Sequence, residues 1–425
     1  MSETPAENPD CDVLVLGASF AGIELVHRLR RHPLGRGLKI TVVDRQAEHG
    51  YIPLVQERLV GRLDPAGSLL PTEKVVTARP DARYVTGVVA GLDPARKEVR
   101  LASGARLRGR FVVVALGSVL APPPTVDGAE RFVGYKFAGE FEGARARLAG
   151  LLGPDGRTVR DSGGAHPYHK GEGEGPAGER PTIVVVGGGI SGVELAGELA
   201  HLGRERPQGW RAPKVVLVHG GARLLPGLAE RAGARAARHL AAQGVELRLG
   251  ARVVRLSAGT AAIQTAGAVE EVACDLAFWA GGVRPAPALA DLGLPRTEAG
   301  WLAVGPTLQC FATPRPTNPD IFAIGDAARV QGATGEWPTM QRAIECLWQA
   351  GLTAKNLLTL AAEPPDYPNG VPPLEPHVLR EDFPHGVSLG GKSLIVYGRL
   401  VLDLAALNTW FRRFLMRQYF ARYRG

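Results

Sequence analysis

The chain has 425 residues, a formal net charge of +8, 45% hydrophobic residues and 22% charged residues. This composition is typical of a globular protein, and the length accommodates two or three domains. Four cysteines form no CxxC pair and no zinc-like spacing, so we expect neither a disulfide framework nor a bound metal. The polar first ten residues do not resemble a signal peptide, and no apolar run is long enough to predict a membrane-spanning helix.

The chain opens on a strand, a glycine turn and a helix. Residues 12–16 are an apolar run, residues 20–32 have helical periodicity, and a second apolar run at 38–43 ends at Asp44. This order predicts a βαβ unit. The turn between strand and helix contains Gly17, Ser19, Phe20, Ala21 and Gly22.

Such a turn suits a dinucleotide. The first glycine permits the tight turn, the last lets helix and strand pack closely, and the helix N-terminus presents free N–H groups to a pyrophosphate. Ser19 stands where the dinucleotide pattern has its middle glycine. Asp44 lies where a carboxylate accepts hydrogen bonds from ribose hydroxyls. The alternative is a plain βα turn followed by an ordinary surface aspartate.

The middle of the chain mixes strands with an irregular segment. Residues 83–89 and 96–101 predict a β-meander, and 111–116 predict a buried strand. Residues 140–152 predict a helix. The following Gly/Pro/charged stretch, 153–181, has no apolar periodicity, and we expect it to be a mobile insert.

A second βαβ unit follows, with strands at 182–186 and 214–218 around a helix at 190–203. Its turn carries all three glycines of the dinucleotide pattern, and it comprises Gly187, Gly189, Ile190, Ser191 and Gly192.

Two side chains of this second unit leave alternatives open. Glu194 is either an ordinary acid at a helix start or a carboxylate near a reacting ring. His219 stands where a carboxylate would favour NAD, so it either tolerates a 2′-phosphate together with Arg223 or points to solvent. The choice between NADH and NADPH therefore stays open.

The last third of the chain contains a β-rich stretch at 245–279 and a short strand that delivers Gly325 and Asp326 to the next helix. With both glycine turns, Gly117 and the Gly281-Gly282 pair, these residues follow the order of two-dinucleotide-binding flavoproteins. The chain resembles the type II NADH dehydrogenases, which pass electrons from NADH to quinone without pumping protons.

The resemblance implies FAD, NADH or NADPH, and a quinone acceptor, and it assigns residues to each. Glu194 would lie near the flavin, and Gln341 and Glu345 would lie near the quinone, Glu345 replacing a family glutamine. The FAD residues would be Gly17, Ser19, Phe20, Ala21, Gly22, Asp44, Arg45, Gly117, Gly325 and Asp326. The nicotinamide dinucleotide residues would be Gly187, Gly189, Ile190, Ser191, Gly192, His219, Gly281 and Gly282. The role of Cys346 stays open.

The C-terminal residues 403–424 combine helically spaced apolar residues with arginines and aromatics. We expect an interfacial helix on a lipid surface, with its arginines and the aromatics Trp410, Tyr419, Phe420 and Tyr423 at the headgroup level. An ordinary helix packed on the protein or on a dimer partner is the alternative. No nucleic-acid-binding motif accompanies the charge.

The sequence thus predicts an α/β fold with two Rossmann-like domains, for FAD and NAD(P), and a C-terminal amphipathic membrane-associating element. The expected limits are 10–120 with 300–375, then 121–299, then 376–425. We expect a homodimeric, peripheral NAD(P)H:quinone oxidoreductase on the cytoplasmic face of a bacterial membrane. A soluble reductase of a ferredoxin-like or small-molecule acceptor and a redox-sensing flavoprotein are the alternatives.

Overall fold

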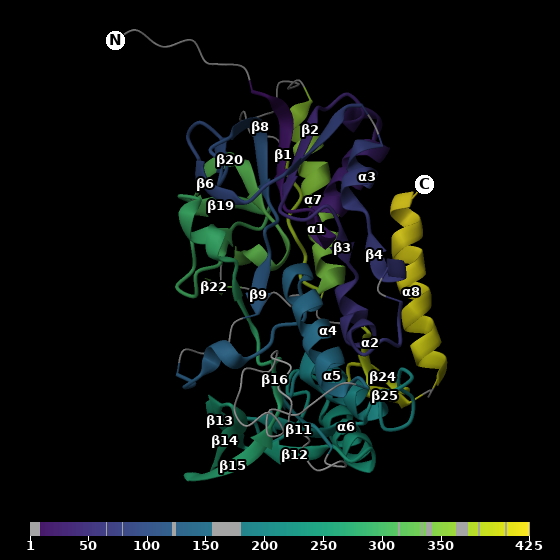
Figure 1. Cartoon of the computed structure of the whole chain (residues 1–425). Coiled ribbons are helices and arrows are strands. Elements are labelled where there is room, and N and C mark those ends of the chain that lie inside the picture. The colour runs from purple at the N-terminus through teal and green to yellow at the C-terminus, as the bar shows by residue number, and fades with distance from the viewer. Residues whose placement is uncertain are drawn as a thin grey trace.

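The computed structural model describes residues 9–64, 66–78, 80–120, 125–154, 180–312, 315–332, 335–336, 342–362, 373–380, 383–403 and 406–424. Two sheets with helices packed on them lie toward opposite ends of the molecule, which Figure 1 shows with the first sheet next to the N-terminus. The predicted insert at 153–181 lies for the most part outside the described residues.

The first sheet carries the first predicted βαβ unit. Its central strands run parallel in the order β20-β8-β1-β2-β5. Strand β1 and the C-terminal half of β8 are almost continuously buried, as expected for parallel strands covered on both faces. Helix α1 packs against α7 on this sheet. The bounds are β1 Cys11–Leu16, α1 Phe20–Arg31, β2 Ile40–Asp44, β5 Ala82–Thr86, β8 Arg106–Val114, β20 Arg315–Ala323 and α7 Ala343–Ala361.

The predicted meander at 83–89 and 96–101 is only partly correct. The segment 83–89 is divided between β5, which pairs with β2 in parallel, and β6 (Val89–Asp93), which pairs with β7 (Glu98–Leu101). The chain turns at Gly87, whose N–H donates to the Asp44 carbonyl at 2.9 Å. Only β6, β7 and β8 form the antiparallel meander.

The second sheet repeats the pattern of the first. Its strands are all parallel, in the order β12-β11-β10-β16, which matches the order β5-β2-β1-β8 of the first sheet. Both predicted Rossmann-like units are therefore present. The bounds are α4 Ala138–Leu152, β10 Thr182–Val186, α5 Ile190–His201, β11 Lys214–His219, α6 Glu230–Ala242, β12 Glu246–Leu249 and β16 Leu276–Trp279.

The β-rich stretch supplies a separate antiparallel sheet in the order β13-β14-β15. Its strands are Ala251–Ser257, Gly259–Thr265 and Ala268–Cys274. Shorter elements complete both halves. These are β3 His49–Gly50, α2 Val55–Leu59, β4 Leu69–Leu70, α3 Thr72–Thr77, β9 Ser118–Leu120, β17 Val283–Pro285, β18 Leu302–Val304, β19 Gln309–Ala312, β21 Ala328–Gly332 and β22 Gly335–Glu336.

The C-terminal element is a three-stranded hairpin sheet followed by a long helix. Strands β23 (His385–Ser388), β24 (Ser393–Tyr397) and β25 (Leu400–Asp403) lead into α8 (Ala406–Arg424). In Figure 1, α8 runs along the side of the molecule past α2 and β4, from the second sheet toward the first. Within the described part of the chain, no helix is both long enough and apolar enough to cross a bilayer.

The faces of α8 differ from the expectation for an interfacial helix. Tyr419, Phe420 and Tyr423, expected at lipid headgroups, are buried in the core of the first sheet. Arg412 and Arg413, expected to face lipid, instead form ion pairs with buried glutamates. Carboxylates that are distant in sequence attract these arginines inward, and helical periodicity alone does not reveal such partners.

Candidate active site

The first glycine turn is a cradle that only glycine can form. Gly17 has a φ of +105°, and a Cβ added to it would lie 2.3 Å from the Ala115 carbonyl oxygen. A Cβ on Gly22 would lie 1.8 Å from the Gly17 carbonyl oxygen. The absence of side chains leaves the N-terminus of α1 open to a phosphate group. These contacts fit the predicted pyrophosphate site.

Asp44 closes this turn from the end of β2. Its carboxylate accepts a hydrogen bond from the Ala18 N–H at 2.6 Å and another from the Gln46 N–H at 2.9 Å. Burial raises the pKa of the Asp44 carboxyl, whereas these N–H groups favour its ionised form. The carboxylate is therefore fixed beside the turn, as a ribose-binding group requires. Arg45, the next residue, is exposed.

Ser19 takes the place of the middle glycine and contacts a buried histidine. Its Oγ lies 3.2 Å from Nδ1 of His49. Burial lowers the pKa of His49 to about 3, so the ring is neutral at physiological pH. His49 was not predicted as a site residue, because no local motif marks a histidine that approaches the turn from another strand.

Gly325 and Asp326 reach the same place from the end of β20. Ser118 Oγ donates to Asp326 Oδ2 at 2.8 Å, and the Gly325 N–H donates to Gln349 Oε1 at 2.7 Å. Gly325 has a φ of +69°. Residues more than two hundred positions apart in the sequence thus fix the orientation of the Asp326 carboxylate. Ser118 is a further residue that sequence motifs did not reveal.

One cavity of about 940 Å³ joins these features, and its size is at the upper end of the range of small-molecule sites. Gly117 and Cys346 also border it, and burial raises the pKa of the Cys346 thiol well above its usual range. The buried thiol is therefore protonated. Predicted residues that line the cavity are Gly17, Ser19, Phe20, Ala21, Asp44, Arg45, Gly117, Ile190, Ser191, Glu194, Gly325 and Asp326.

The second glycine turn has the same backbone geometry as the first. Gly187 has a φ of +125°, and a Cβ on Gly192 would lie 1.8 Å from the Gly187 carbonyl oxygen. A Cβ on Gly189 would meet open space. The segment after β16 that leads into Gly281 and Gly282 lies against Gly187, as the segment after β8 that leads into Gly117 lies against Gly17. The turn leaves the N-terminus of α5 open in the same way.

His219 and Arg223 occupy positions that do not match a simple 2′-phosphate site. The His219 ring lies against Gly188, where an added Cβ would come within 2.5 Å of the ring, and burial lowers its pKa. The Arg223 guanidinium donates to the carbonyl oxygens of Leu225, Pro226 and Leu228. Arg223 is therefore used to hold its own loop. His219 stays at the end of β11, where Asp44 stands in the first unit.

Glu194 lies at the junction between the two halves. It is 5% exposed, lines the large cavity, and accepts hydrogen bonds from the Ser388 N–H at 2.9 Å and from Arg412 at 2.8 Å. Burial raises the pKa of this carboxyl to about 7, against the opposing effect of Arg412. A carboxylate with a pKa near neutrality, in a cleft, is typical of a functional site.

The two predicted quinone residues have different outcomes. Gln341 lies outside the described residues. Glu345 is buried and accepts a hydrogen bond from Gln349 at 3.1 Å, and its Oε1 lies 3.5 Å from Nε2 of His377. Glu345 is not among the residues that line the large cavity, whereas the neighbouring Arg342, Ile344 and Leu347 are.

Comparison with known proteins identifies the family. The pyridine nucleotide-disulphide oxidoreductase family matches residues 11–350, more than three quarters of the chain. The chain belongs to this family.

Curated relatives show which members of this family the oxidoreductase resembles. The type II NADH:quinone oxidoreductase of Haemophilus influenzae is 28% identical, over 83% of this chain and 81% of that protein. The demethylphylloquinone reductase of Synechocystis is 30% identical, over 83% of this chain and 82% of that protein. The predicted resemblance to type II NADH dehydrogenases is confirmed.

Solved structures confirm the fold of this oxidoreductase. A structure of NDH2 from Plasmodium falciparum in complex with NADH superposes with a TM-score of 0.78 at 11% identity, covering 97% of this chain and 96% of that one. The sulfide:quinone oxidoreductase of Aquifex aeolicus superposes with a TM-score of 0.73 at 15% identity, covering 97% and 91%. At these identities the likeness concerns the fold alone.

Proposed function

We propose that this oxidoreductase passes electrons from NADH to a quinone through bound FAD. The observation that carries the proposal is the single cavity that joins the first glycine turn, Asp326 and the first turn of α5 with Glu194. When bound there, FAD supplies the hydride-accepting and electron-donating chemistry that protein side chains lack. The relatives named above favour NADH as donor and a quinone as acceptor.

The chain's own residues divide into two binding groups. Gly17, Gly22 and Asp44 would hold the adenine half of FAD, while Asp326 would accept hydrogen bonds from its central chain. Gly187, Gly189 and Gly192 would hold the nicotinamide dinucleotide on α5. The domain limits of 10–120 with 300–375, 121–299 and 376–425 stay predictions that accompany this division.

The exposed side of α8 supports association with a lipid surface. Trp410 and Phe411 are 59% and 42% exposed, and Trp410 stacks on Phe414 with ring centroids 5.5 Å apart. Leu415 is exposed and also lines the large cavity, so the apolar face borders the site where the flavin would lie. We define the outer face as Tyr397, Leu400, Leu402, Leu407, Trp410, Phe411, Phe414 and Leu415.

An apolar face of this kind favours a bilayer, because its burial in lipid removes it from water. It would hold the chain as a peripheral protein at the cytoplasmic face of a bacterial membrane, near a membrane quinone. A second copy covering the outer face, as in a homodimer, is the competing occupant.

Flotation with liposomes distinguishes a lipid surface from a second copy of the chain as the partner of the outer face. The full chain is expected to float with vesicles, and Trp410→Ser with Phe414→Ser to reduce flotation severalfold. Val269→Ser, on β15 and 55% exposed, is the matched control and should float like the wild type. Unchanged flotation of the double variant would contradict lipid binding. A shift from dimer to monomer in sedimentation would assign the face to a second copy.

The acceptor is tested after anaerobic reduction. Protein reduced with one equivalent of NADH is mixed with a short-chain soluble quinone, and the flavin absorbance is followed. Recovery of the oxidised spectrum at a rate that rises with quinone concentration is expected. Reoxidation that does not depend on quinone concentration would overturn the quinone assignment.

A further inference from the structure

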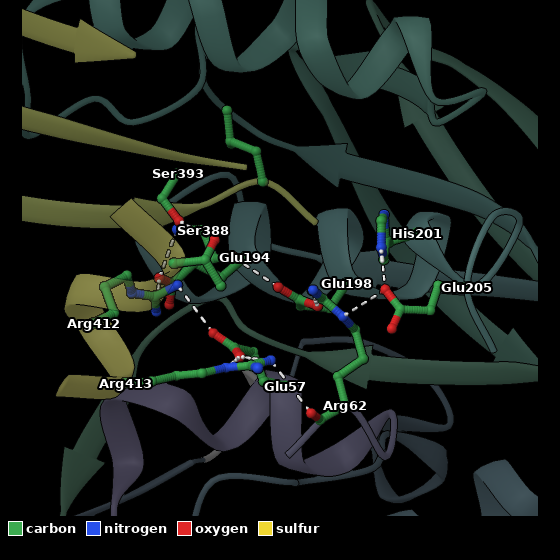
Figure 2. Close-up of polar contacts among 12 residues, drawn as sticks. Glu57, Arg62, Glu194, Glu198, His201, Glu205, Ser388, Ser393, Arg412 and Arg413 are labelled. Atoms are coloured by element: carbon green, nitrogen blue, oxygen red, sulfur yellow. Dashed lines mark hydrogen bonds and ion pairs between the residues drawn. The ribbon is translucent and has the colours of Figure 1, made fainter. Parts of the chain in front are cut away.

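A cluster of buried charges joins α8 to the first turn of α5. Figure 2 shows the carboxylates of Glu57, Glu194 and Glu198 between α2, α5 and α8, with arginines reaching them from α8 and from the residues after α2. All three carboxylates are at most 5% exposed.

Each carboxylate of the cluster has its own arginine. Arg62 Nη1 lies 2.7 Å from Glu198, and Arg413 Nη2 lies 2.8 Å from Glu57. Arg412 Nη2 lies 2.8 Å from Glu194. Three carboxyl groups and three guanidinium groups are therefore paired, so the loss of Arg412 would leave the buried Glu194 carboxylate without its arginine.

Arg412 makes the link between the helix and the cavity. The same Nη2 donates to the Pro53 carbonyl at 2.8 Å, and its Nη1 lies 3.5 Å from Glu57 Oε1. These contacts fix the guanidinium beside Glu194, and both side chains line the large cavity. Arg413, one residue along, reaches Glu57 and is not among the lining residues.

We propose that Arg412 is a positioning residue for the reaction with NADH, and that it keeps Glu194 ionised and oriented at the nicotinamide end of the cavity. The inference rests on the proposed function. It makes the C-terminal helix a part of the active site as well as a membrane contact. Coupling of this kind is reciprocal, so the nicotinamide end would in turn favour the seated helix.

The chemistry of hydride transfer predicts the direction in which the charge of Glu194 acts. The nicotinamide ring becomes cationic when hydride leaves it, so an ionised carboxylate nearby stabilises that change. The groups that face Glu194 are Arg412 from α8, Glu57 from α2, Glu198 from α5, the Ser388 N–H from β23 and Tyr135. Of these, Arg412 carries the positive charge closest to the Glu194 carboxyl, whose pKa burial raises to about 7.

Infrared spectra recorded against pH test the proposal without NADH. The band of the protonated Glu194 carboxyl is assigned by its loss in Glu194→Gln, and its titration is compared between wild type and Arg412→Gln. The midpoint is expected to rise by about one pH unit or more in Arg412→Gln. In Arg412→Lys, which keeps the positive charge, the midpoint is expected to return most of the way to the wild-type value. An unchanged midpoint would overturn the proposal.

The kinetic consequence is measured by anaerobic stopped flow. Reduction by NADH at pH 7 should slow about fivefold or more in Arg412→Gln and recover at higher pH, because a rise of one unit from a pKa of about 7 lowers the ionised fraction of Glu194 at pH 7 by about that factor. Arg417→Gln, an exposed arginine on the same helix, is the matched control and should keep the wild-type profile. Wild type that NADH does not reduce would refute the proposed function itself, while leaving the infrared result to decide the role of Arg412.

The proposal can also be tested if the Arg412→Gln variant does not fold. Should Arg412→Gln fail to fold because a bare carboxylate stays buried, adding Glu194→Gln should restore folding. Failure of this rescue would show that Arg412 acts by a route other than Glu194, and it would overturn the proposal.

Discussion

The two glycine turns share one backbone design and differ in the side chains around it. In both, the last glycine lies so close to the first that an added Cβ would come within 1.8 Å of a carbonyl oxygen. The first turn is closed by Asp44, which accepts the Ala18 N–H, whereas the second is bordered by the His219 ring. We therefore propose that backbone geometry makes each turn a diphosphate cradle, and that the residue at the end of the second strand determines which dinucleotide ribose the turn binds.

The largest expected effect comes from filling the two cradles separately. Gly22→Ala should yield protein that does not retain FAD, because the added methyl group displaces the turn. The displacement should cost about 3 kcal/mol of FAD binding free energy. Gly192→Ala should keep the flavin colour but be reduced by NADH up to about a hundredfold more slowly. Visible spectra and stopped-flow reduction measure both effects.

The controls for this pair are a second glycine and a second reductant. Gly143→Ala, on α4 with open space around it, should behave as the wild type. Dithionite should reduce Gly192→Ala normally, since it needs no dinucleotide site. A Gly22→Ala protein that binds FAD normally would show that the first turn is not the flavin cradle.

The next effect concerns the carboxylate of the first turn. Asp44→Ala removes the acceptor of two backbone N–H groups, and charge-assisted hydrogen bonds contribute about 1.5–3 kcal/mol each. The dissociation constant of FAD, measured by fluorescence quenching, should rise by at least about tenfold. Asp12→Ala provides the matched control, because Asp12 accepts the Lys39 N–H at 2.8 Å without lining the cavity. Equal affinity losses in both variants would refute a role of Asp44 at the ribose.

A smaller effect should follow from giving the second turn the residue of the first. His219→Asp supplies a carboxylate for the ribose 2′-hydroxyl, and we expect the ratio of kcat/KM for NADH over NADPH to rise about tenfold. Arg223→Gln should leave this ratio unchanged, since its guanidinium holds backbone carbonyls. A fall in the ratio for His219→Asp would contradict the equivalence of the two strand ends.

The smallest effect is expected at the departure from the glycine pattern. Ser19→Gly removes one neutral contact, to His49 at 3.2 Å, which contributes about 1 kcal/mol. FAD affinity measured by titration should change by less than about tenfold. Complete loss of FAD would mean that Ser19 itself, and not the backbone, holds the diphosphate.

The sequence predicted the parts of the site that local physics determines. The two glycine turns, Asp44 and the delivery of Asp326 follow from strand–turn–helix patterns, and their backbone geometry is as expected. Ser118, His49 and Arg412 were missed, because each reaches the site through a tertiary contact with a distant segment. Arg412 and Arg413 of α8 were wrongly expected to face lipid for the same reason, since their partners Glu194 and Glu57 lie more than two hundred residues away.

The central claim is that one turn holds a flavin and the other its electron donor. An anaerobic titration of the purified protein with NADH, followed by visible absorbance, tests this claim most directly. We expect a yellow protein whose flavin bands bleach fully with one equivalent of NADH. A folded protein that takes up no FAD, or a bound flavin that NADH leaves oxidised, would contradict it.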